Sequence, residues 1–168
     1  MEQPAIGRDE AAAFGFLTVV ESPVHGTFGG YLLVDVLGRP LEFHCTAPVR
    51  VSRAQAILYG PTLQPHLHGR QIGGALLAAG TLAPVVVLTD QEPLLQARAE
   101  SSLPVALVRR ADSEPGPAGL TLGEVEVRPA AGPLDDAVRE RLTALAVAVD
   151  LREPFERIRA AIDEAQRH

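Results

Sequence analysis

Apolar residues alternate with polar residues or glycine along the first third of the chain. Residues 14–20 (Phe-Gly-Phe-Leu-Thr-Val-Val) are rich in aromatic and β-branched side chains, a composition that predicts a strand. Two further strands are predicted over 31–37 and 41–45, each preceded by residues typical of turns. Together the three segments indicate an antiparallel meander, in which Gly29 and Gly30 mark a bulge or a close backbone approach.

Two helices are predicted after the meander. Ser52 and Gln55 have the spacing of a capping box, so a short helix should begin there and end at the Gly-Pro pair that follows. A second helix is expected from about residue 65 to 79. In this helix Gly69 and Gly73 are one turn apart, and they leave a bare face that can press closely on a neighbouring element.

Short apolar runs in the middle of the chain predict strands that are buried on both faces. Residues 84–90 and 103–108 have this pattern, and a helix is predicted between them at about 91–101. The β-α-β spacing implies a right-handed parallel crossover. Further on, Val125 and Val127 alternate with glutamates, which indicates a half-exposed edge strand.

Apolar residues at helical spacing dominate the C-terminal part of the chain. The first stripe consists of Leu134, Val138, Leu142, Leu145 and Val149, and the second of Phe155, Ile158 and Ile162. We therefore expect an α/β domain over 14–132 and a helical segment over 133–168, which packs either on this domain or on a partner.

The predicted elements form an α/β fold with a mixed, roughly five-stranded sheet, built from the antiparallel meander and the β-α-β units and followed by the C-terminal helices. Their order is the one found in ribonuclease-H-like folds, an analogy of topology only. Nucleases of that fold carry an acidic residue within the first strand for a two-metal site. The segment from Phe16 to Val20 has no acidic residue, so an active nuclease of that kind is not expected.

Several segments resemble a family of uncharacterised bacterial proteins. They are FGFLTVVE from residue 14, FGGYLLV from residue 28 and RPLEFHCTAP from residue 39, and the segment from Leu58 to Leu63 fits the same pattern. The resemblance covers roughly residues 14–110. It implies no established activity, cofactor or partner.

The composition removes several kinds of chemistry. All fifteen basic residues are arginine, and the absence of lysine excludes a lysine Schiff base, a pyridoxal-phosphate anchor and a P-loop of the usual form. No cofactor is predicted. A net charge of −6 does not provide the basic surface that phosphate binding needs, so nucleic acid is not an expected partner.

The sequence also indicates the cellular compartment of the protein. No apolar run is long enough to span a bilayer, and the first eight residues lack the basic start and apolar core of a secretory signal. The single cysteine cannot form an internal disulfide, which fits a reducing compartment. These features favour a cytoplasmic protein without a membrane partner.

Three of the five histidines and the only cysteine lie between residues 44 and 68. His44, His66 and His68 are candidate catalytic residues because imidazole titrates near neutral pH. Asp90 joins them because it ends a predicted buried strand, where open α/β sheets place functional groups. His66 and His68 are also candidate metal ligands, provided that the backbone there is extended. The alternatives are surface histidines and a helix N-cap at Asp90.

Cys45 beside His44 has the elements of a nucleophile and its base. Strand alternation instead places Cys45 with Leu41 and Phe43 on one apolar face, and Glu42 with His44 on the opposite face. We therefore predict that Cys45 is buried and slow to react, and that His44 lies on the solvent side of its strand.

No catalytic set is complete, so the sequence does not decide whether the chain is an enzyme. The leading interpretation is a small, non-catalytic interaction or accessory module, in which the C-terminal helices bind a protein partner or a second copy of the chain. The alternative is a hydrolase-type enzyme, metal-assisted in one form, with a site around the three histidines and Asp90.

Overall fold

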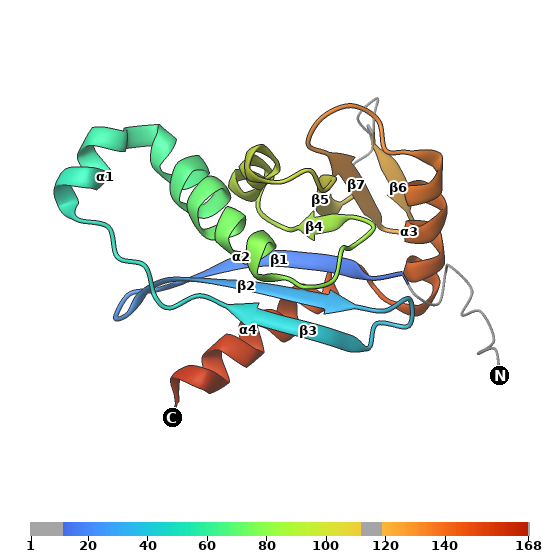
Figure 1. The fold of residues 1–168 in the computed structure, drawn as a ribbon, viewed down its shortest axis with the longest axis horizontal. Coiled ribbons are helices and arrows are strands. Elements are labelled where there is room, and N and C mark those ends of the chain that lie inside the picture. The colour runs from blue at the N-terminus through green and yellow to red at the C-terminus, as the bar shows by residue number, and fades with distance from the viewer. Residues whose placement is uncertain (1–11, 112–118, 168) are drawn as a thin grey trace.

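The computed structural model describes residues 12–111 and 119–167, and its centre is a mixed β-sheet (Figure 1). The strands are β1 (Phe14–Ser22), β2 (Gly26–Val34), β3 (Pro40–Cys45), β4 (Val87–Thr89), β5 (Val105–Arg110), β6 (Leu120–Leu122) and β7 (Val125–Pro129). The helical elements are α1 (Arg53–Tyr59), the 3₁₀ turn η1 (Gly60–Thr62), the π-helix η2 (Pro65–Gly73), α2 (Gly74–Ala79), the 3₁₀ helix η3 (Glu92–Glu100), α3 (Asp136–Ala148) and α4 (Glu153–Gln166). The first residues, on which the expectation about a secretory signal rests, lie outside the described ranges.

The strands lie in the order β3-β2-β1-β4-β5-β7-β6. β2 pairs antiparallel with β1 and β3, whereas β4 runs parallel to both β1 and β5. The first five strands therefore form the predicted meander and parallel crossover, in ribonuclease-H-like order, and the α/β class is confirmed. The predicted count of five strands is wrong, because β7 and β6 extend the sheet to seven beyond β5.

The predicted edge strand at Val125 and Val127 is in fact an inner strand, because β7 lies between β5 and β6. Glu126 on β7 is fully buried, and its carboxylate lies 3.2 Å from the guanidinium of Arg109, its direct neighbour on β5. Alternating glutamate and valine is typical of a half-exposed strand. The pattern misleads here because the cation that partners the glutamate comes from another strand.

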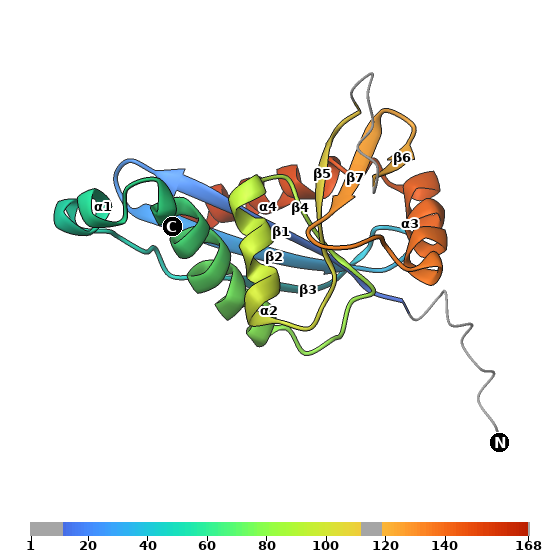
Figure 2. The same cartoon turned by 90° about the horizontal axis from the view of Figure 1, so that it is seen from above.

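Helices cover both faces of the sheet (Figures 1 and 2). α4 lies on β1 and β2 on one face, and η2, α2 and η3 lie on the opposite face. β1 contributes to both layers because its side chains alternate: Phe14 and Phe16 join the cluster that contains α4, whereas Leu17 and Val19 join the other. The ring of Phe16 meets that of Phe155 edge to face, with centroids 5.4 Å apart.

Gly29 and Gly30 lie inside β2 and confirm the predicted close backbone approach. A Cβ atom on Gly29 would lie 2.2 Å from Cγ2 of Ile72, and one on Gly30 would lie 2.3 Å from Cγ2 of Ile158. Because successive strand residues face opposite sides of a sheet, the two glycines let η2 press on one face and α4 on the other at the same point.

The C-terminal apolar stripes belong to the core of this chain. The stripe residues of both helices are all buried, with Leu142 and Leu145 fully so, and they cluster with side chains from the strands. The predicted helices are thus confirmed as α3 and α4. Within the described residues, no helix is both long enough and apolar enough to cross a membrane.

Strand β3 presents the opposite face from the one predicted. Leu41 and Phe43 are 45% and 41% exposed, and Cys45 is also exposed, so the prediction of a buried thiol is wrong. Glu42 and His44 are the partly covered residues instead. The reason is the position of β3 at the edge of the sheet, where the face that carries the apolar side chains extends past α4 and stays open to solvent.

Candidate functional site

Two polar clusters lie at the carboxyl end of the parallel strands, one on each face of the sheet. Asp90 follows β4 directly, beside Thr18 of β1, since Leu17 pairs with Thr89 in the parallel register. The Thr18 hydroxyl donates a hydrogen bond of 2.7 Å to Oδ1 of Asp90. The guanidinium of Arg159, from α4, forms an ion pair with Oδ2. Both carboxylate oxygens of Asp90 are therefore engaged by protein groups.

This first cluster does not fit the two-metal site that ribonuclease-H-like nucleases carry. The neighbour of Asp90 on the first strand is Thr18, a neutral hydroxyl, and a cationic side chain, Arg159, lies where a metal would need a free carboxylate oxygen. Among residues 12–111 and 119–167, no group of three or more His, Cys, Asp or Glu side chains is arranged to hold a metal ion. We therefore derive no chemistry from a metal here.

The second cluster lies on the opposite face and centres on His68. This residue is 5% exposed, and its Nε2 lies 3.5 Å from a carboxylate oxygen of Glu21, whose own side chain is 64% exposed. Burial lowers the pKa of His68 below its ordinary value, and the nearby negative charge of Glu21 opposes this shift only in part. A lowered pKa favours the neutral imidazole, in which one ring nitrogen carries no hydrogen and can accept a proton.

Close helix packing places His68 at this position. Gly69 has no side chain to separate η2 from η3, and a Cβ there would lie 2.4 Å from the carbonyl oxygen of Pro93. Gly73 likewise faces Ala97, and a Cβ atom on Gly73 would lie 2.9 Å from Cβ of Ala97. The predicted bare face is thus confirmed, and it holds η2 so that His68 lies beside the end of β1.

His68 and Glu21 line a solvent-open hollow of about 450 Å³, which we call the His68 hollow. Its other lining residues are Val19, Gln64, Gln91 and Pro93. A neighbouring hollow of about 360 Å³ shares His68, Glu21 and Gln64 and adds Arg50, Ser22 and Thr27. Both volumes fall within the range of small-molecule sites.

Gln91 is fixed in the wall of the His68 hollow by two hydrogen bonds. Its side-chain Nε2 donates to the carbonyl oxygen of Val19 at 2.9 Å, and its backbone N–H donates to the hydroxyl of Thr89 at 3.2 Å. This residue follows Asp90 directly, so the carboxylate on one face of the sheet and the amide on the other are held by the same short segment.

The other two candidate histidines lie elsewhere. His66 stacks flat on Tyr59, with ring centroids 4.9 Å apart and planes inclined by 17°. His44 lies on β3, where its Nε2 is 3.6 Å from a carboxylate oxygen of Glu42. His66 and His68 line different hollows, since two residues apart on a helical backbone they face different directions. Catalytic roles for these residues, and a metal shared by His66 and His68, stay predictions.

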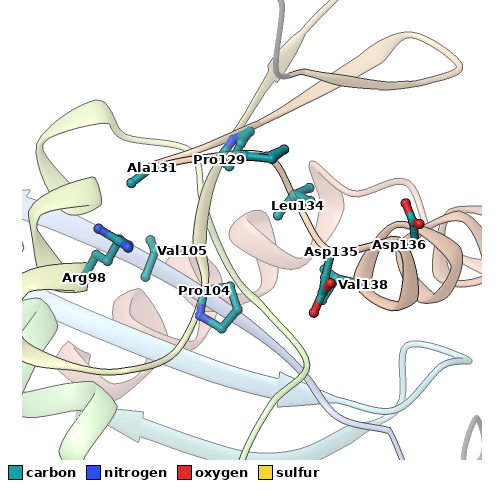
Figure 3. Close-up of a pocket in the computed structure, with 10 residues that line it drawn as sticks. Arg98, Pro104, Val105, Pro129, Ala131, Leu134, Asp135, Asp136 and Val138 are labelled. Carbon is teal, nitrogen blue, oxygen red and sulfur yellow. The ribbon is translucent and has the colours of Figure 1, made fainter.

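A further hollow of about 390 Å³ lies where β5 begins and β7 ends (Figure 3). Its charged residues are Arg98 on one side and Asp135 and Asp136 on the other, as Figure 3 shows, and all three are exposed. This hollow has no buried titratable side chain among its lining residues. The buried histidine His68, whose pKa is lowered by burial, lines the His68 hollow instead.

Sequence reasoning found His68 and Asp90 but missed their partners. Glu21 lies in a stretch that the pattern assigns to a turn, and only the longer β1 of the structure brings it beside His68. Arg159 is one of two arginines on α4, and no local signal separates it from the other. Thr18 alone had a signal, because it is the one polar side chain between Phe16 and Val20.

Comparison with known proteins gave structural matches only. No protein-family model matches the chain, and no curated protein is similar to it in sequence. Similar solved structures include Endonuclease V of Ciona intestinalis in complex with inosine-containing DNA, at 11% identity and a TM-score of 0.48, covering 79% of this chain and 76% of that one. The catalytic domain of human Endonuclease V has 13% identity and a TM-score of 0.48, with coverage of 92% and 84%. Argonaute of Marinitoga piezophila with guide RNA has 11% identity and a TM-score of 0.41, with coverage of 82% and 26%.

Two predictions need correction. The interpretation as a non-catalytic module that acts through the apolar stripes of its C-terminal helices is wrong, because these stripes are buried in the chain's own core. These stripes are therefore not available to a protein partner or a second copy. The prediction against nucleic acid as a partner stands against the similar solved structures, which include complexes with DNA and RNA.

Proposed function

We propose that the chain is a hydrolase that acts on the phosphodiester backbone of nucleic acid, with His68 as its general base. The observation that carries this proposal is the pair formed by His68 and Glu21 in the His68 hollow. A general base must be unprotonated at working pH and must border a space that substrate can enter. His68 meets both conditions, because burial lowers its pKa and the hollow is open to solvent.

In the proposed reaction, His68 accepts a proton from a water molecule as the water oxygen bonds to phosphorus. The bond between phosphorus and the leaving oxygen breaks, and the imidazolium returns the proton to that oxygen. Glu21 stabilises the transient imidazolium through its negative charge at 3.5 Å. The amides of Gln64 and Gln91 are the neutral donors in the wall of the hollow that can bind phosphate oxygens.

Asp90 has a supporting part in this proposal. Its carboxylate joins β1, β4 and α4 through Thr18 and Arg159, and so it fixes the segment that carries Gln91. Asp90 is therefore a positioning residue and does not contact the reacting atoms.

Local charge supports nucleic acid as the substrate class. No acidic residue occurs between Glu42 and Asp90, although the chain as a whole has a net charge of −6. The same segment contains Arg50, Arg53 and Arg70. Arg70 is paired with Glu100 of η3, so Arg50, which lines the neighbouring hollow, and Arg53 are the cations of this segment that can attract a polyanion.

The test is hydrolysis of end-labelled single-stranded RNA, single-stranded DNA and duplex DNA by the whole chain. Wild-type protein is compared with His68→Gln, with Glu21→Gln and with the matched control His25→Gln, whose exposed histidine lies outside the His68 hollow. We expect His68→Gln to lose about a hundredfold or more in rate and Glu21→Gln to lose less. The control should keep full activity, and EDTA should leave all rates unchanged because the Asp90 cluster does not fit a metal. Equal rates for wild type and His68→Gln would refute the proposal.

A further inference from the structure

Residues 52–62, which we call the α1 arm, are all exposed. The arm comprises Ser52, α1 and η1, and it stands away from the sheet at one end of the molecule (Figures 1 and 2). It nevertheless carries large apolar side chains: Ile57 and Leu58 are 70% and 84% exposed, and Tyr59 is 40% exposed. Contiguous exposed apolar side chains of this kind are typical of a binding surface.

The conformation of the arm is held by local contacts and not by burial. Ser52 and Gln55 form both hydrogen bonds of the capping box. At the other end, the hydroxyl of Thr62 donates to the carbonyl oxygen of Tyr59 at 2.6 Å. A helix of seven residues without a buried face gains little from propensity alone. Local hydrogen bonds therefore define the conformation of the arm, but α1 has no buried face to stabilise it. This is expected of a segment that packs against another molecule.

The only aromatic ring of the arm is already part of a stack. Tyr59 lies parallel to His66 with ring centroids 4.9 Å apart, and the tyrosine hydroxyl is 3.4 Å from Nε2 of that histidine. One ring face of Tyr59 is thus engaged, and much of its remaining surface is in solvent. Such a flat platform suits a planar ligand better than it suits an aliphatic one.

The charge around this platform selects an anionic partner. Arg50 and Arg53 flank the start of the arm, and both are exposed. Arg50 donates hydrogen bonds to the carbonyl oxygens of Val24 and His25, which positions its guanidinium beside the β1–β2 turn. No carboxylate occurs from residue 43 to residue 89. Planar rings combined with backbone charge are the features of single-stranded nucleic acid.

We infer that the α1 arm binds single-stranded nucleic acid, with a base stacked on Tyr59 and the backbone beside Arg50 and Arg53. The inference rests on the proposed function for its substrate class and deepens it. The arm leads into η2, and Arg50 lines both the hollow that Tyr59 and His66 border and the hollow of about 360 Å³ that shares His68 with the His68 hollow. A strand held on the arm therefore continues toward the His68 hollow.

The experiment measures binding without turnover. Full-length His68→Gln protein is titrated into fluorescently labelled thymidine, adenosine and uridine homopolymers of about 20 nucleotides, enough to span the arm, and anisotropy is recorded at two salt concentrations. Tyr59→Ala in this background should weaken binding about tenfold or more, as expected for one lost stack. Tyr59→Phe should retain most of the affinity. Arg53→Gln should weaken binding and flatten its dependence on salt.

Tyrosine fluorescence gives a second readout of base stacking on Tyr59. It compares the parent with Tyr59→Phe, so it does not matter if Tyr59→Ala unfolds the arm locally. The chain has no tryptophan and only two tyrosines, of which Tyr31 is buried. Stacking of a base should therefore quench the exposed Tyr59, and the quench should vanish in Tyr59→Phe while anisotropy still reports binding.

Three results would overturn the inference: equal affinity of Tyr59→Ala and its parent for every homopolymer, no binding by the parent, or binding of the arm to anionic lipid vesicles in preference to oligonucleotides. These results concern binding alone. If His68→Gln binds as expected but wild type fails to hydrolyse any strand, the proposed function fails and the arm inference stands.

Discussion

The hydroxyl of Thr18 donates a hydrogen bond to Oδ1 of Asp90 across the parallel strands β1 and β4, at 2.7 Å. Thr18 is fully buried, and the second carboxylate oxygen of Asp90 pairs with Arg159 of α4. The aspartate therefore ties two strands and a helix together at the carboxyl end of the sheet.

Replacement of Thr18 by valine should lower the free energy of unfolding by about 1–2 kcal/mol, because the carboxylate loses a buried donor without a change in shape. Urea denaturation measures the effect. The matched control is Thr121→Val on the edge strand β6, where the threonine is exposed, and its effect should stay within about 0.5 kcal/mol. A Thr18→Val protein as stable as wild type would show that Arg159 alone holds Asp90.

The pKa of His68 predicts how stability depends on pH. Burial lowers this pKa in the folded chain, while the unfolded chain has the ordinary value of about 6.5. As pH falls below about 6.5, the unfolded state binds a proton that the folded state refuses, so the free energy of unfolding decreases. The His68 contribution is complete above that pH. Urea denaturation of wild type and His68→Gln between pH 7.5 and 5.5 should show a steeper decrease for wild type, and parallel curves would contradict the lowered pKa.

Leu142 and Val147 provide a matched pair on α3. Leu142 is fully buried, whereas Val147 is 87% exposed. Leu142→Ala should cost about 2–5 kcal/mol through lost packing and the cavity left behind, and Val147→Ala should be near neutral. Thermal or urea melts give both values. Light scattering should find the same mass for both variants, since the stripe packs within the chain. If Leu142→Ala dissociated an oligomer without losing stability, the α3 stripe would be part of an interface between chains and not of the core.

Cys45 should react with a thiol reagent in native protein at nearly the rate seen in denatured protein, because its side chain is exposed on the edge strand β3. One equivalent of label per chain is expected, since the chain has a single cysteine. Slow labelling under native conditions that becomes fast in urea would show that this face of β3 is covered.

The sequence predicted most helices and the inner strands because their signals are local. The capping box at Ser52 set the start of α1 correctly, and the apolar runs located β4 and β5. Local patterns failed where the exposure of a side chain depends on which other element of the fold packs beside it. Phe43 and Cys45 appear as a core face until β3 is known to lie at the edge, and Glu126 appears exposed until Arg109 is placed beside it.

The same limit applies to the site. His68 and Asp90 were recognisable as titratable residues in promising positions, but their chemistry is set by partners distant in sequence. Glu21 is 47 positions before His68, and Arg159 is 69 positions after Asp90. Whether a histidine is buried and neutral or exposed and charged follows from those contacts, and no spacing rule within a single sequence supplies them.

The consecutive glycines of β2 bear on how distant relatives of this chain can be recognised. Ile72 and Ile158 touch positions 29 and 30 from opposite sides, so an alanine at either position requires the facing isoleucine to become smaller. Homologous chains should therefore keep a Gly-Gly pair midway along the second strand, or change each glycine together with its facing residue. This coupled pattern joins three segments far apart in sequence. It can therefore serve as a search query that does not depend on the residues of the His68 hollow.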